Sequence, residues 1–91
     1  MIYHIKFTDI ALQDLKSLKK SEPSAYKKAL RLIDELMTHP SFGTGKPEQL
    51  KGDKRGLWSR RITAKHRLVY EIIDDVLTVL VLSAYKHYGD K

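Results

Sequence analysis

One segment near the end of the chain, residues 76–83 (VLTVLVLS), is almost continuously apolar. An uninterrupted apolar run of this length is typical of a strand that lies inside a sheet and is buried on both faces. A strand of this kind requires neighbouring strands. The other segments of the 91-residue chain must therefore supply the rest of a sheet and the helices that cover it.

Three further segments have the alternation of apolar and polar residues that predicts strands. Residues 3–7 place three apolar side chains on one side and His4 and Lys6 on the other. Residues 58–63 and 67–73 show the same pattern, and Asp74-Asp75 predicts a tight turn into the apolar run. The strands at residues 58–63 and 67–73 and the apolar run follow one another closely in the second half of the chain, which predicts mainly antiparallel pairing.

Two helices are predicted between the first strand and the others. Thr8 or Asp9 can cap the first helix, and Ser21 with Pro23 predicts the start of the second, which Pro40 closes. Residues 41–46 contain two glycines and are predicted to form a loop. The core-facing stripes are Ala11, Leu15 and Leu18 in the first helix and Ala25, Ala29, Leu32, Ile33, Leu36 and Met37 in the second.

The predicted element order is β-α-α-β-β-β, an α+β fold in a single domain spanning residues 1–91. In this class the two helices pack on one face of the sheet. The opposite face remains available for a ligand. The chain is long enough to bury a core of its own, although a small one.

The composition limits the classes of function. Seventeen Lys and Arg against eleven Asp and Glu give a net charge of +6, which favours a polyanionic partner, either nucleic acid or an anionic membrane, or an acidic protein. Cysteine is absent, which excludes a disulfide scaffold and a thiol nucleophile. We find no signal peptide and no apolar stretch of membrane-spanning length, so we expect a soluble cytoplasmic protein without a membrane partner.

Side chains suited to the cleavage of RNA occur in the second half of the chain. If Leu68 and its alternate neighbours join the core, Arg67 must stand on the open face of the sheet, where its planar guanidinium can bind phosphate. RNA supplies its own nucleophile, the 2′-hydroxyl, and the enzyme supplies a base, an acid and positive charge. Glu48 suits the base and His87 the acid, with Arg61 and Arg67 stabilising the charge. No metal ligands or other cofactor are expected.

Each of these residues also has a simpler interpretation. Glu48 could form a loop ion pair with its flanking lysines, and Arg67 could be a solvated strand residue. His87 could be an unstructured surface histidine, and Tyr88 a core-edge residue or a stacking platform for a base. Trp58 and His66 are interpreted as structural, because Trp58 faces away from Arg61 and His66 lies at the start of a strand.

Four blocks of sequence, in this order, resemble the YoeB/Txe branch of the RelE-type toxins. They are residues 45–51 (GKPEQLK), 56–63 (GLWSRRIT) and 66–70 (HRLVY), and the pair His87-Tyr88. The resemblance implies the RelE-like microbial ribonuclease fold. It also implies a toxin of a type II toxin–antitoxin system that cleaves mRNA in the ribosomal A site and stops translation.

The resemblance assigns roles residue by residue. It implies Glu48 as base, Arg67 as transition-state stabiliser, His87 as acid and Tyr88 as a supporting contact. Lys51 and Arg61 match phosphate-binding positions. The implied partners are the ribosome with its mRNA and a cognate antitoxin of the YefM/Phd type, and an exposed sheet edge would permit a homodimer.

Two other classes of function fit the same fold. A ParE-type toxin acts on DNA gyrase without cutting RNA, and would not need a Glu, His and Arg set. A ribosome- or RNA-binding module could block translation while the message stays intact. Both remain alternatives to the endoribonuclease.

Overall fold

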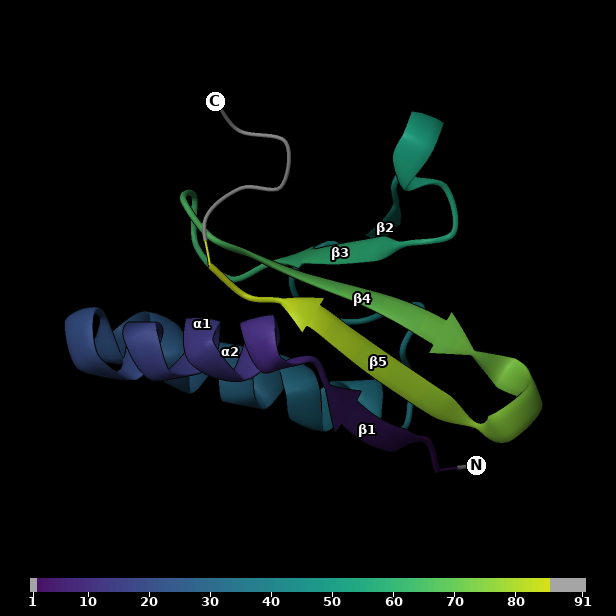
Figure 1. The fold of residues 1–91 in the computed structure, drawn as a ribbon, viewed down its shortest axis with the longest axis horizontal. Helices are drawn as coiled ribbons and strands as arrows, with labels where there is room; N and C mark the ends of the chain where they lie inside the picture. Colours follow the sequence, from purple (N-terminus) through teal and green to yellow (C-terminus); the bar gives the residue numbers. More distant parts are fainter. Residues whose placement is uncertain (1, 86–91) are drawn as a thin grey trace.

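The computed structural model describes residues 2–85 and has two helices packed on one face of a five-stranded sheet (Figure 1). The elements are β1 (His4–Phe7), α1 (Asp9–Ser21), α2 (Pro23–Leu36), β2 (Glu48–Gln49), the 3₁₀ turn η1 (Gly52–Lys54), β3 (Trp58–Arg61), β4 (Arg67–Ile73), the 3₁₀ turn η2 (Asp74–Val76) and β5 (Thr78–Ser83). The predicted α+β architecture is confirmed. One addition is the two-residue strand β2, which the predicted order lacks.

The strands lie in the order β1-β5-β4-β3-β2. β1 pairs with β5 in parallel, and all other pairs are antiparallel. The apolar run therefore forms an interior strand, as predicted, although it begins at Thr78 rather than at Val76. Val76 lies in η2 with 62% of its surface exposed, and Leu77 takes a left-handed conformation that reverses the chain.

Burial on both faces of β5 was predicted and is only half right. Thr78, Val79 and Val81 are buried, whereas Leu80 and Leu82 are only partly buried. The reason is that both helices lie on the same side of the sheet. Among the described residues, the face of β5 away from the helices is thus less covered than the face that meets them.

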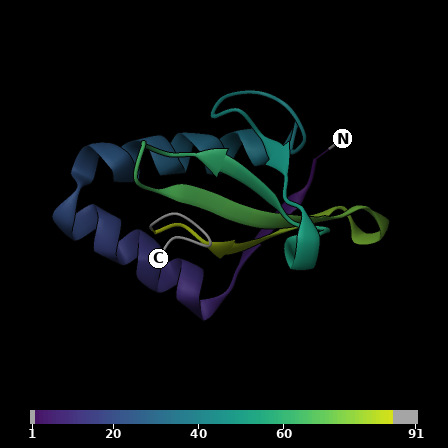
Figure 2. The same cartoon turned by 90° about the horizontal axis from the view of Figure 1, so that it is seen from above.

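The two helices form a hairpin (Figure 2). Thr8 caps α1, because its Oγ1 accepts a hydrogen bond from the Ala11 N–H at 3.0 Å. Of the two predicted caps, Thr8 and Asp9, the first is therefore the correct one. Glu22 occupies the N-cap position of α2 without a capping hydrogen bond from its side chain, and Pro23 lies in the first turn as predicted, whereas Ser21 is the last residue of α1. α2 ends at Leu36, before Pro40, and Met37 follows the helix with 37% of its surface exposed. The predicted core position of Met37 is therefore wrong.

The core lies between the helices and the inner face of the sheet. The predicted helical stripes supply it, without Met37 and with Ile33 only partly buried, together with Leu68 and Tyr70 from β4 and Val79 and Val81 from β5. This burial confirms which face of β4 meets the helices, and it leaves Arg67 on the other face. None of the helices within residues 2–85 is long and apolar enough to cross a membrane.

Candidate active site

The open face of the sheet, which is the face away from the helices, carries a row of side chains from three adjacent strands, although Ser59 and Val69 within this row are buried. In the strand register Glu48 of β2 lies opposite Ser59 of β3, and Ser59 lies opposite Val69 of β4. One step along, Arg61 lies opposite Arg67. Glu48 and Arg67, which are 19 positions apart in sequence, are therefore brought to neighbouring places on one surface. The alternation of β3 and β4 predicted this shared face for Ser59, Arg61 and Arg67.

Arg67 is in direct contact with the predicted base. Its Nη1 donates to Glu48 Oε1 at 3.2 Å and to Ser59 Oγ at 3.3 Å. The Arg67 side chain is 14% exposed, whereas that of Glu48 is 60% exposed. The carboxylate thus stays accessible to a substrate while its cation is held against the sheet. This contact is the centre of the candidate site.

The contact corrects the simpler interpretation of Glu48, an ion pair with its flanking lysines, and leaves its role as a base a prediction. Among residues 2–85, the ion pair of Glu48 is with Arg67, and none joins it to Lys46 or Lys51. A carboxylate beside a guanidinium on an open surface can accept a proton from a bound hydroxyl, and the guanidinium can bind the phosphate next to that hydroxyl. The geometry therefore permits the predicted acid–base chemistry at one half of the site.

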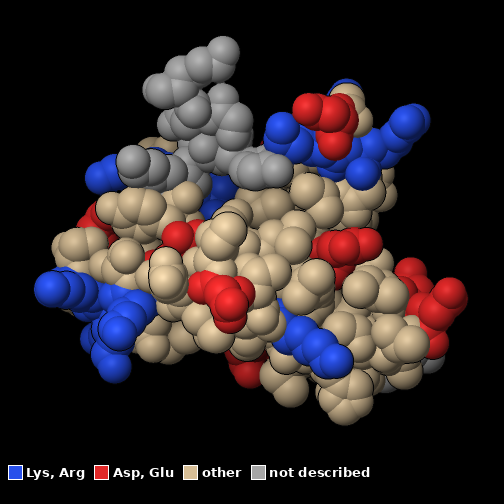
Figure 3. Space-filling model, viewed as in Figure 1, with Lys and Arg blue, Asp and Glu red and all other residues tan. Residues whose placement is uncertain are grey.

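The two predicted phosphate-binding residues lie on the surface. Arg61 is exposed at the end of β3, and Lys51 is exposed at the start of the turn η1. Figure 3 shows Lys and Arg side chains gathered around η1, with a second group over the end of the α1–α2 hairpin. Positive charge on both flanks favours the approach of a polyanion.

His87 and Tyr88, the predicted acid and its supporting residue, lie outside the described residues 2–85. Their roles remain predictions. The last strand before them, β5, ends at Ser83, which pairs with Val69 of the site row. The chain thus passes beside the candidate site shortly before these two residues.

His66 has the structural role that its position predicted. It is fully buried, its Nε2 lies 2.6 Å from Glu22 Oε2, and its ring stacks on Tyr85 with 4.7 Å between the ring centres. The hydrogen bond from His66 lowers the pKa of Glu22 below its ordinary value. This pair fastens the helix hairpin to the loop between β3 and β4.

Arg60 is a residue that the analysis of the sequence missed. It stands between Ser59 and Arg61, so the alternation that puts these two on the open face puts Arg60 on the core side of β3, and the structure shows its side chain fully buried there, 2.8 Å from Glu35 of α2. A buried guanidinium requires a hydrogen-bond acceptor for each donor. An arginine at a core position of an alternating strand was therefore a signal for a polar network, which the loop at residues 39–44 provides.

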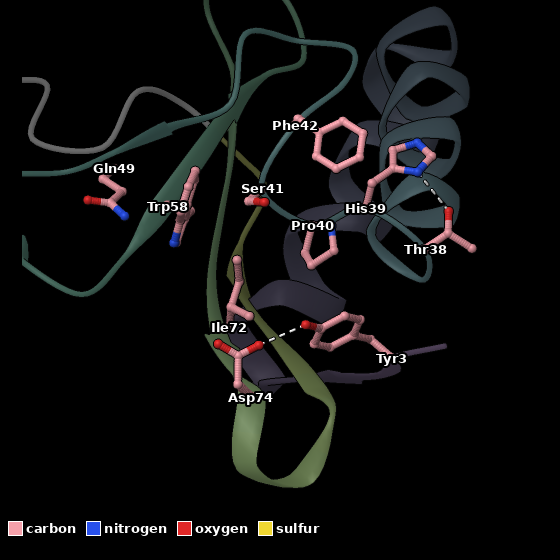
Figure 4. Close-up of a pocket in the computed structure, with 10 residues that line it drawn as sticks. All are labelled: Tyr3, Thr38, His39, Pro40, Ser41, Phe42, Gln49, Trp58, Ile72 and Asp74. Carbon is pink, nitrogen blue, oxygen red and sulfur yellow. Dashed lines mark hydrogen bonds between the residues drawn. The ribbon is translucent and has the colours of Figure 1, made fainter. Parts of the chain in front are cut away.

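A hollow of about 430 Å³ lies on the other side of β2 and β3 (Figure 4). Gln49 and Trp58 line it, whereas their neighbours Glu48 and Ser59 lie on the open face. Trp58 is thus half-buried rather than a full core residue. His39 and Phe42 stack at the rim with 5.0 Å between their ring centres. The hollow is separate from the candidate active site.

Two helices packed on one face of this five-stranded sheet form a RelE-like fold, and comparison with known proteins identifies the family. The model of the YoeB-like toxins of bacterial type II toxin–antitoxin systems matches residues 7–88. Toxin YoeB of Streptomyces coelicolor is 43% identical over 84 residues, which cover 92% of this chain and 98% of that protein.

Two solved structures of YoeB from Staphylococcus aureus are similar in fold. The YoeB dimer is 32% identical with a TM-score of 0.83, and the YoeB–YefM complex is 32% identical with a TM-score of 0.80. In each case the match covers 97% of this chain and 100% of the other. The chain belongs to the YoeB-like toxin family of type II toxin–antitoxin systems.

Proposed function

We propose that this toxin is a ribosome-dependent endoribonuclease that cleaves mRNA in the ribosomal A site and so inhibits translation. The observation that carries the proposal is the contact between Glu48 and Arg67, at 3.2 Å on the open face of the sheet. Family membership and the net charge of +6 support a nucleic-acid substrate.

The proposed reaction is an in-line attack of the 2′-hydroxyl on the adjacent phosphorus. Glu48 takes the proton of this hydroxyl, and the new P–O2′ bond forms as the P–O5′ bond breaks. Arg67 stabilises the negative charge that builds up on the phosphate oxygens. His87 gives a proton to the 5′ oxygen that leaves, with Tyr88 in support. The products are a 2′,3′-cyclic phosphate and a 5′-hydroxyl.

Lys51 and Arg61 are proposed to bind the phosphates that flank the cleaved bond. Their exposure suits contact with a long polyanion rather than with one buried group. The ribosome would hold the message in the geometry that in-line attack needs, since a small open face can fix only a few atoms of a flexible strand. The reaction proposed here requires no metal and no other cofactor.

The proposed protein partners are a cognate antitoxin of the YefM/Phd type and a second copy of the toxin. The S. aureus relatives were solved as a YoeB–YefM complex and as a YoeB dimer. A basic toxin surface would attract an acidic antitoxin segment, which could cover the same face that RNA uses.

Expression of point variants in a bacterial host tests the proposal. Glu48→Ala and His87→Ala should both abolish growth arrest, while each variant still unfolds cooperatively and still co-purifies with the antitoxin. Exposed Glu48 contributes little to stability, so loss of toxicity would report chemistry rather than unfolding. Full growth arrest by both variants contradicts the proposal, and a DNA-damage response without mRNA cleavage would favour an action on gyrase.

A further inference from the structure

The buried guanidinium of Arg60 uses all five of its N–H donors. Nε donates to Tyr70 Oη at 3.2 Å, and Nη1 donates to Glu35 Oε1 at 2.8 Å and to the Thr44 carbonyl at 3.3 Å. Nη2 donates to the carbonyls of His39 and Phe42 at 2.6 and 2.8 Å. Three of the five acceptors are therefore backbone carbonyls of one loop, residues 39–44.

Tyr70 and Glu35 complete the same network. The Tyr70 hydroxyl donates to the Pro40 carbonyl at 2.8 Å, and Glu35 Oε1 also accepts from the Thr44 N–H at 3.0 Å. The hydrogen bonds from Thr44 and then Arg60 keep the pKa of Glu35 below its ordinary value, so the carboxylate is ionised at neutral pH. The loop between α2 and β2 is thus held at four of its residues by three side chains.

The held loop leads directly into the candidate active site. Next to Thr44, the Gly45 carbonyl accepts from the Arg61 N–H at 2.7 Å, and Glu48 follows three residues later. The loop packs closely at this point, because a Cβ on Gly45 would lie 3.0 Å from the Arg61 carbonyl oxygen. The position of the Glu48 backbone therefore depends on the loop segment that the Arg60 guanidinium holds.

Strand β3 connects the network to the site from the other side. Arg60 lies between Ser59 and Arg61, whose side chains occupy the open face. Fixing the Arg60 side chain in the interior thus also fixes the strand that carries Ser59, a partner of Arg67. Figure 4 shows His39 and Phe42 of this loop beside each other at the edge of the neighbouring hollow, and His39 Nε2 also lies 3.9 Å from Glu35 Oε1.

We infer that Arg60 and Glu35 are positioning residues for cleavage: they hold the loop at residues 39–44 so that Glu48 stands against Arg67. The inference rests on the proposed function. It concerns the rate of the chemical step rather than binding, because neither residue belongs to the open face. A small displacement of a reacting group lowers the rate of such a step strongly.

The test uses two substitutions at Glu35, since removal of Arg60 could prevent folding. Glu35→Gln keeps an oxygen that can accept from both Arg60 and the Thr44 N–H, and Glu35→Ala removes it. Leu12→Gly serves as the control, because it lowers stability at an exposed position of α1 without changing the charge or the loop. Each variant is compared with wild type on defined mRNA in purified ribosome complexes.

We expect Glu35→Ala to cleave about 10–100-fold more slowly than wild type at saturating toxin, with half-saturation unchanged. Glu35→Gln and Leu12→Gly should stay within about threefold of wild type. Hydrogen exchange at residues 44–48 should speed up in Glu35→Ala alone. If wild type cleaves the message, equal cleavage rates in Glu35→Ala and Leu12→Gly, together with equal hydrogen exchange at residues 44–48, would overturn the inference.

Failure of the proposed function gives a different result, since wild type itself would then leave the message intact. Hydrogen exchange in the free toxin would still decide whether the network holds the segment before Glu48. Faster exchange at residues 44–48 in Glu35→Ala than in Leu12→Gly supports that part, and equal exchange refutes it.

Discussion

Replacement of Arg67 by Lys should separate catalysis from stability. The substitution keeps the positive charge and the attraction to RNA, but it removes the planar fork that can bind two phosphate oxygens. Arg67 Nη1 contacts Glu48, whose side chain is 60% exposed, so their ion pair contributes under about 1 kcal/mol to stability, and the hydrogen bond to Ser59 contributes about as much again. Lysine can still donate to one of the two partners, so we expect the free energy of unfolding to change by less than about 2 kcal/mol.

The loss in cleavage should be much larger. Removal of one donor aimed at the charge of a transition state typically lowers the rate by about 10²–10³-fold, or about 2.7–4 kcal/mol. Single-turnover cleavage of mRNA in ribosome complexes and urea unfolding measure the two quantities. Arg31→Lys, at an exposed position of α2, is the matched control. Cleavage by Arg67→Lys within about threefold of wild type would refute the proposed role of the guanidinium.

Three further predictions concern stability. Because the folded-state pKa of Glu22 is lowered, its contribution is present above the ordinary carboxyl pKa and is lost as the pH falls through the folded value. The stability gap between wild type and Glu22→Gln in urea should therefore narrow on acidification, and a constant gap would contradict this. Gly43→Ala should cost roughly 1–3 kcal/mol and more than Gly52→Ala, because both have positive φ but only at Gly43 would a Cβ meet Glu35 Oε1, at 2.5 Å. Equal thermal unfolding of the two would refute that steric argument. Leu32→Ala, at a fully buried position, should cost about 2–5 kcal/mol in urea unfolding, and a loss below about 1 kcal/mol would argue against its place in the core.

The parts of the fold that depend on local pattern could be predicted from the sequence. The spacing of Ala11, Leu15 and Leu18 identified the buried stripe of α1, because helical periodicity alone fixes which side chains share a face. Alternation in β4 likewise put Arg67 on the open face, opposite the buried Leu68. The contact of Arg67 with Glu48 depends in addition on the pairing of β2 with β3.

The parts that depend on distant contacts could not be predicted in the same way. The two residues of β2 are too few to show alternation, and the parallel pairing of β1 with β5 joins the two ends of the described chain. The acceptors of Arg60 are loop carbonyls, which every residue carries and which no sequence pattern marks. Alternation placed Arg60 inside, but only the folded loop shows how its charge is accommodated.

Primer extension on a defined mRNA in a purified ribosome complex tests the central claim most directly. The account predicts a new 3′ end in the A-site codon with wild type, and none with Glu48→Ala or His87→Ala. Intact message with wild type, under conditions where the protein still binds ribosomes or halts growth, would contradict it.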